Sequence, residues 1–225
     1  MSSTPLSGSS PGGSSRGALY HHFDNLHQQK SSVTLGMWVF LANEVLFFGG
    51  VFMVYLFYRH AYPEAFAAAS HHLDITYGAI NTVVLISSSL TMALAVHSAQ
   101  QGNRKGIDLF VILTMLLGFV FLGIKGIEYH HKWVEHHVPG FGFHFDGPWA
   151  PQAQLFFLLY FVLTGLHATH MVIGAGIMTA LLIWNRQGKF TKEYSAPVEV
   201  AGLYWHFVDI VWIFLFPLLY LISRH

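Results

Sequence analysis

This sequence is poor in charged residues and has no cysteine. Only 10% of its 225 residues are charged, whereas an ordinary soluble domain carries about 25%, so the chain lacks the charges to solvate a surface of its size. The absence of cysteine excludes disulfides, thiolate zinc sites and cysteine nucleophiles. Eleven basic and eleven acidic residues leave no net charge, which disfavours nucleic acid as a partner. Motifs for phosphate-binding loops, nucleophile elbows and metalloprotease helices are also missing.

Apolar side chains dominate instead, at 53% of residues, with a mean hydropathy of +0.47. Five apolar stretches are each long enough for the roughly 20 residues with which a helix crosses about 30 Å of hydrocarbon. Polar segments containing proline or glycine separate them. The sequence therefore predicts an all-α, polytopic membrane protein, a bundle of five transmembrane helices. The expected spans are residues 35–58, 77–99, 107–129, 153–184 and 198–222.

The chain divides into a polar segment, residues 1–33, and the five-helix domain, residues 34–225. The first segment begins with a Ser/Gly/Pro tract and is expected to be a disordered tail, without the apolar run of a secretory signal peptide. The N-terminal segment and the second and fourth connections between spans fall on one side of the membrane and carry seven Lys and Arg residues. The other side carries three, or four if Lys125 is included. The side with seven is expected to be cytoplasmic. This predicts a cytoplasmic N-terminus and an external C-terminus. The seven residues are Arg16, Lys30, Arg104, Lys105, Arg186, Lys189 and Lys192.

Several ionisable residues fall inside the predicted spans, where a charge is costly. Glu44 has two open interpretations: a protonatable or lipid-pairing carboxylate, or a neutral acid bonded to a neighbouring helix. His206 and Asp209, three apart on one helix face, are expected to form a structural pair, with a proton relay as the alternative. Lys125 and Glu128 lie near a span end and are expected to be a solvated interfacial pair, the lysine snorkelling to water.

Histidine is abundant, with 16 residues, but its spacing selects no metal or haem site. His167 and His170 lie three apart, and two such ligands without a nearby carboxylate or thiolate favour interhelical hydrogen bonds over metal binding. The run at residues 130–137 is interpreted as surface histidines, with opportunistic zinc or copper binding as the alternative. No two histidines are selected as axial haem ligands. No catalytic residue and no metal site is predicted.

The segment Tyr204-Trp205-His206-Phe207-Val208-Asp209, followed by residues 211–216, closely resembles the final-helix signature of subunit III of the haem–copper oxidases, best known from cytochrome c oxidase. Further matches follow in the family's order and extend the resemblance over residues 34 to 223. Many members have seven helices; this chain matches the last five, as do the family's five-helix bacterial forms. The matching positions include residues 43–48, Asn81, Thr82, Thr91, His97, Glu128, Tyr129, Asp146, Gly147, residues 165–174 and Glu199.

The resemblance implies a subunit with no cofactor of its own in a complex that reduces dioxygen to water and pumps protons. Haem and copper are expected in partner subunits, with direct contact to subunit I, subunits II and IV nearby, and bound phospholipid. The implied roles are to stabilise subunit I, bind lipid and support proton uptake, and the implied location is a bacterial plasma (inner) membrane. Glu44 matches the family's carbodiimide-reactive carboxylate, and Arg186 matches a position associated with lipid phosphate. Glu199 matches a family glutamate and is grouped, together with Glu128, with the interhelical polar residues.

Other functions stay open on the sequence. A quinol oxidase subunit III and a nitric-oxide-reductase accessory subunit have similar signatures, and membership of a larger respiratory supercomplex is undecided. A proton-coupled transporter would use Glu44, His206 and Asp209 as its proton path. A metal-handling membrane protein would use the histidines of residues 130–137.

Overall fold

The described part of the chain folds into six α-helices, five of which are long and apolar enough to cross a membrane. The computed structural model describes residues 26–140, 142–146, 148–188, 190 and 194–221, with backbone only for 26–30. This confirms the predicted all-α class and its five spans. The helices are α1 (Leu26–Ala61), α2 (Pro63–Ser70), α3 (Ile75–Gln101), α4 (Arg104–Val134), α5 (Ala150–Arg186) and α6 (Ala196–Tyr220).

Two features differ from the sequence-based expectation. Helix α1 begins at Leu26, so residues 26–33, assigned to the disordered tail, belong to the first helix; residues 1–25 of that tail lie outside the described residues. The short helix α2 was not predicted, because Pro63 was interpreted only as a break. Pro63 occupies the first turn of α2, where its fixed φ favours a helix and its missing N–H costs nothing.

Local capping sets the turn between α3 and α4. Gly102 ends α3 with a φ of 75°, in the left-handed region that glycine adopts without strain. The Asn103 side chain then accepts a hydrogen bond from the Gly106 N–H at 3.1 Å, which caps the start of α4. A two-residue connection therefore makes α3 and α4 an antiparallel hairpin.

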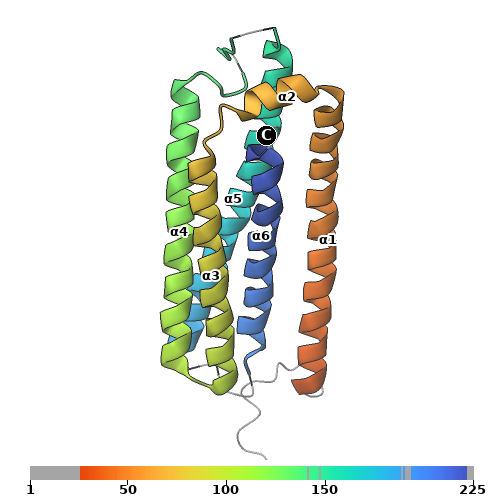
Figure 1. Cartoon of the computed structure of the whole chain (residues 1–225). Helices are drawn as coiled ribbons and strands as arrows, with labels where there is room; N and C mark the ends of the chain where they lie inside the picture. Colours follow the sequence, from red (N-terminus) through yellow and green to blue (C-terminus); the bar gives the residue numbers. More distant parts are fainter. Residues whose placement is uncertain (1–25, 141, 147, 189, 191–193, 222–225) are drawn as a thin grey trace, which may run out of the picture.

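Helices α3, α4, α5 and α6 form a bundle, and α1 stands beside it against α6 and α5 (Figure 1). We call the end that holds the start of α1 and the α3–α4 turn the lower end. The opposite, upper end carries α2, the α4–α5 loop and the end of α6 (Figure 1). Arg104, Lys105 and Arg186 all lie at the lower end, so these three of the seven basic residues that the sequence placed on one side of the membrane share one end. Arg16, Lys189 and Lys192 lie outside the described residues.

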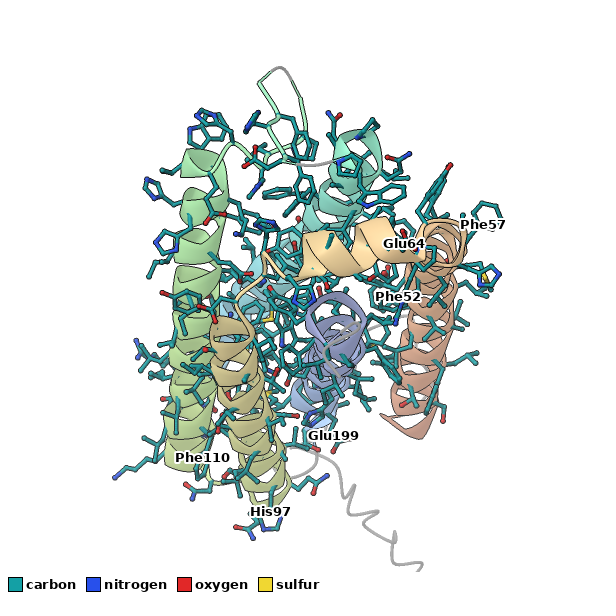
Figure 2. All side chains as sticks on the ribbon, turned by 45° about the horizontal axis from the view of Figure 1, so that its top comes forward. Phe52, Phe57, Glu64, His97, Phe110 and Glu199 are labelled. Carbon is teal, nitrogen blue, oxygen red and sulfur yellow. The ribbon has the colours of Figure 1, made fainter. Side chains whose placement is uncertain are left out.

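Close packing inside the bundle contrasts with an apolar exterior. The Trp205 ring is buried against Gly118 of α4 and Gly174 of α5. A Cβ atom added at Gly118 would lie 3.0 Å from the ring, and one added at Gly174 would lie 2.8 Å from it. On α1, Phe57 points away from the bundle and is 67% exposed, whereas Phe52 packs on the core side (Figure 2). A helical exterior with this many exposed large apolar side chains is suited to lipid or to other membrane helices.

Candidate functional site

Glu44 and His170 form the polar contact between α1 and α5. Glu44 Oε2 lies 3.2 Å from His170 Nε2, and each side chain is 13% exposed. The other ring nitrogen, Nδ1, lies 2.9 Å from the Leu166 carbonyl oxygen, which can only accept, so Nδ1 carries a hydrogen. A hydrogen bond across the 3.2 Å contact therefore requires a second proton, held on either the carboxyl or Nε2. The geometry makes Glu44 part of a proton-holding pair.

His167 does not join this pair, although it lies only three residues away. The ring is fully buried against Phe121 and Trp212, with centroids 5.3 and 5.2 Å away. Neither ring nitrogen has a hydrogen-bond partner among the described residues. The expected interhelical hydrogen bond is therefore present at His170 and has no counterpart at His167 in the described part of the chain.

Lys125 and Glu128 are paired, but inside the bundle rather than at its surface. Lys125 Nζ donates to Glu128 Oε2 at 2.9 Å and to the hydroxyl oxygens of Tyr220 and Tyr160 at 2.5 and 3.4 Å. Both tyrosine hydroxyls donate to Glu128 Oε1, at 2.9 Å from Tyr160 and 2.5 Å from Tyr220. Trp212 covers Lys125 with its ring, 4.7 Å from Nζ. These contacts satisfy both charges, so the lysine has no need to reach water.

The structure corrects the expectation of a solvated pair here. Lys125 is 5% exposed and Glu128 2%. The error has a physical reason. Lys125 lies close enough to the end of α4 for its side chain to reach water, but Tyr160 of α5 and Tyr220 of α6 cover it. Nothing in the sequence marked these two tyrosines.

His206 and Asp209 share a helix face as expected, but no hydrogen bond or ion pair joins them among the described residues. His206 Nδ1 instead lies 2.7 Å from Ser89 Oγ of α3. Asp209 is 3% exposed, and Ser89 is also the hydrogen-bonding neighbour of its carboxyl group. Ser89, His206 and Asp209 border a groove of about 380 Å³ between α3 and α6.

Glu199 and Arg186 both lie at the lower end. Glu199 Oε1 accepts from Ser195 Oγ at 2.7 Å and from the Gln100 side chain at 3.4 Å, which ties the start of α6 to the end of α3 (Figure 2). Arg186 is exposed in the last turn of α5. Glu199 is thus an interhelical contact, and Arg186 is accessible from the lower membrane surface.

The histidine run at the upper end is only partly a surface feature. His130, His131 and His136 are exposed, whereas His137 is buried with its ring stacked 4.9 Å from that of Phe157. Its Nδ1 lies 3.1 Å from Glu135 Oε2. Among the residues with defined placement, no three His, Cys, Asp or Glu side chains are grouped as a metal site requires.

Burial and nearby charges perturb the ionisation of this upper loop. Burial lowers the pKa of His137, and the Lys132 charge adds to this, while the Glu135 hydrogen bond opposes it. Burial and the adjacent His137 likewise lower the pKa of His72. Burial acts to raise the pKa of Glu135, but the hydrogen bond and charge of Lys132 outweigh it, so the pKa stays below its usual value. Lys132 also donates to the His72 carbonyl oxygen at 2.7 Å.

A polar pocket of about 590 Å³ opens at the upper end between the α2–α3 connection and the end of α4. Its lining includes Asp74, His131 and Lys132. It also includes Glu128, the carboxylate that is paired with Lys125. The pocket therefore brings the upper surface close to the Lys125–Glu128 pair.

Comparison with known proteins gives a consistent result. The family model described as "Cytochrome c oxidase subunit III" matches residues 16–224. "Cytochrome c oxidase subunit 3" of Corynebacterium diphtheriae is 35% identical over 85% of this chain and 88% of the relative. "Quinol oxidase subunit 3" of Bacillus subtilis is 31% identical, over 84% and 86%. "Cytochrome c oxidase subunit 3" of Oncorhynchus mykiss is 32% identical over 82% of this chain but 67% of the relative.

Proposed function

The chain belongs to the cytochrome c oxidase subunit III family and is a multi-pass membrane component of a terminal oxidase; from this premise we propose that it serves a cytochrome c oxidase of a bacterial plasma (inner) membrane. Relatives named for cytochrome c oxidase, at 35% and 34% identity, support this donor. A relative named for quinol oxidase at 31% identity makes quinol the second candidate.

The proposed role is structural support of the oxygen-reducing subunit. Subunit III of this family carries no redox centre, so electron transfer, dioxygen reduction and haem and copper binding belong to partner subunits. This chain packs directly against subunit I, with subunits II and IV further away, and holds phospholipid at its surface. It stabilises the catalytic core and supports proton uptake from the cytoplasmic side.

The Glu44–His170 pair is the observation that supports the link to protons. Glu44 lies near the middle of α1, and its contact with His170 requires a proton between two heavy atoms 3.2 Å apart. A neutral acid bonded to a neutral imidazole avoids placing separated charges in hydrocarbon. Such an acid is also the form that hydrophobic carbodiimides attack, so we assign the carbodiimide-reactive role to Glu44.

Purification through a tag on this chain, in mild detergent, tests the proposal. We expect a haem-containing complex, with oxygen uptake supported by reduced cytochrome c and insensitive to added quinol. Uptake driven by quinol alone would establish the second candidate. A colourless preparation of this chain without partners would refute the oxidase role.

Glu44→Gln tests the assignment of the reactive acid. We expect the variant to assemble, because an amide can still bond to His170, and to lose labelling by a hydrophobic carbodiimide. Glu64→Gln is the matched control, since Glu64 lies exposed on α2 at the upper end (Figure 2), and it should leave labelling unchanged. Labelling that persists in Glu44→Gln would refute the assignment.

We also propose a cytoplasmic lower end, with Arg186 binding lipid phosphate there. The chain is free of cysteine, so single cysteines report membrane sidedness. An impermeant maleimide should label Gln101→Cys only from the cytoplasm and His144→Cys only from outside; the reverse pattern would invert the topology. Arg186→Met should lower the phospholipid that copurifies, whereas Lys105→Met, at the same end, should not; equal lipid content would refute the Arg186 assignment.

A further inference from the structure

Two fully buried polar side chains inside the bundle make no hydrogen bond among the described residues. They are Asn81 of α3 and His167 of α5, each 0% exposed. Both amide atoms of Asn81 and both ring nitrogens of His167 are without a partner in the described part of the chain. Buried polar atoms are nearly always bonded to protein or to ordered water. These two side chains therefore indicate ordered water inside the bundle.

Contacts with Trp212 of α6 place both residues in one layer of the bundle. The Trp212 ring lies 5.2 Å from that of His167, centroid to centroid. Its Nε1 donates to Thr82 Oγ1 at 3.1 Å, and Asn81 directly precedes Thr82 on α3. Lys125 Nζ lies over the same indole, 4.7 Å from the ring centroid. The unbonded side chains therefore belong to the layer that contains Lys125.

Above this layer, protonatable groups continue to the upper surface. Lys125, Glu128 and Lys132 are all buried on α4, at spacings of three and four residues that place them on one helix face. Glu128 and Lys132 also border the polar pocket of about 590 Å³ at the upper end. A line of protonatable residues thus extends from that pocket down to Lys125.

Below this layer, the line ends at the Glu44–His170 pair. His170 follows His167 by three residues on α5, so the two rings share a helix face. His167 lies within electrostatic range of both His170 and Lys125. Its ring is therefore between the buried ion pair above and the Glu44–His170 pair below.

The two helices that form the Glu44–His170 pair offer no comparable line toward the lower end. On α5, no Asp, Glu, Lys, Arg or His lies between His170 and Arg186, and on α1 none lies between Lys30 and Glu44. From α6, Tyr204 reaches the pair, but its hydroxyl donates to the His170 carbonyl oxygen at 3.0 Å. The protonatable side chains that continue from the pair lead upward.

We propose that Asn81 and His167 bind ordered water through which Glu44 exchanges protons with the upper side of the membrane. The inference rests on the proposed function, in which Glu44 is the carbodiimide-reactive acid. It adds a direction: protonation of Glu44 follows the acidity of the upper side, which the proposed topology makes the external side.

Each proton step leaves the residues above Glu44 as they were. A proton enters on Glu128 from the pocket, and Lys125 takes it while giving one of its own to the bound water. The longest of the three Lys125 hydrogen bonds, at 3.4 Å to Tyr160, marks the N–H most readily given to water. His167 then accepts a proton on one ring nitrogen and releases one from the other, and that proton reaches the Glu44–His170 contact.

A cryo-EM map of the intact oxidase that resolves ordered water tests the binding site. We expect water within hydrogen-bonding distance of a His167 ring nitrogen and of the Asn81 amide. A map that shows ordered water elsewhere in the complex but none at these two residues would overturn the proposal.

Carbodiimide labelling with a different pH on each side of the membrane tests the direction. A hydrophobic carbodiimide dissolves in the bilayer and reaches Glu44 from either side, and mass spectrometry measures its adduct in sealed membrane vesicles that contain the complex. Raising the pH at the upper end should slow labelling of Glu44 by up to roughly tenfold per pH unit, whereas the same change at the lower end should have no effect. Labelling that follows only the lower pH would overturn the inference, whereas no labelling at all would refute the assignment of Glu44 under the proposed function.

Substitutions of the two unbonded residues test the route. His167→Phe keeps an aromatic ring beside Trp212 but removes both nitrogens, so labelling of Glu44 should no longer respond to the upper pH. His167→Gln retains a group that bonds to water and should keep more of the response, and Asn81→Leu provides a second variant that should lose it. His97→Phe is the matched control, because His97 lies exposed at the lower end (Figure 2). An unchanged response in assembled His167→Phe and Asn81→Leu complexes would show that these residues are not on the route.

Discussion

Neutralising one member of the buried Lys125–Glu128 pair should destabilise the bundle strongly. In Lys125→Met, Glu128 keeps the hydrogen bonds from Tyr160 and Tyr220 but loses the only cation bonded to it among the described residues. In Glu128→Gln, the amide oxygen still accepts from the tyrosines, but Lys125 is left as a buried, unneutralised cation. Removing one partner of a buried ion pair costs about 3–5 kcal/mol, which corresponds to a fall of roughly 6–20 °C in Tm for a chain of this size.

The double variant Lys125→Met/Glu128→Gln should be more stable than either single variant. It buries no charge, and the amide oxygen introduced at position 128 would still satisfy both tyrosine hydroxyls. Thermal unfolding of the detergent-purified complex, followed by circular dichroism, measures all three. Lys105→Met is the control, because Lys105 is exposed at the start of α4 and its loss should change stability by about 0.5 kcal/mol or less.

The outcome that contradicts this reasoning is clear. If Lys125→Met is as mild as the Lys105→Met control, the lysine is solvated and the network is not buried. If the effects of the two single substitutions simply add in the double variant, the two charges are not coupled.

Two further predictions concern packing and pH. Gly174→Ala should destabilise the chain by about 1–3 kcal/mol, because the new methyl would meet the Trp205 ring at 2.8 Å. The control Gly176→Ala meets no atom within 4 Å and should be neutral or stabilising. Equal Tm values for the two variants would refute the packing at Trp205. The upper loop should loosen as pH falls below about 6.5, because burial lowers the pKa of His137 and His72 and the opened loop then binds protons more readily. After correction for intrinsic exchange rates, residues 135–140 should therefore be less protected from hydrogen exchange at pH 5.5 than at pH 7.5. Greater protection at pH 5.5 would contradict the assignment.

The sequence was sufficient for the spans because their signals are local. Runs of apolar residues and the breakers between them placed all five helices, and Pro151 and Pro197 lie in the first turns of α5 and α6. The same local evidence failed at α2, since a proline that ends one helix can equally begin the next. The first predicted span also begins nine residues after the start of α1, because a polar segment can continue a helix beyond the membrane.

The sequence also identified most of the ionisable groups that matter, but not their partners. Depth along a span marked Glu44 and Asp209, because a carboxyl within hydrocarbon always requires an explanation. Their surroundings depend on which helices face each other. Spacing on one helix predicted that His206 would pair with Asp209, but the histidine is bonded to Ser89 of α3 instead.

Composition and the lengths of the apolar runs thus determined the class of the protein and its membrane spans, and the resemblance of particular segments pointed to an oxidase subunit III. Only the tertiary structure determined that His170 meets Glu44, that two tyrosines enclose Lys125 and that His206 bonds to Ser89. The physical reason is the range of the interactions. Hydropathy and capping act within a few residues, whereas hydrogen bonds between membrane helices join distant positions, such as Glu44 and His170, 126 residues apart, and Tyr55 and Leu218, 163 residues apart.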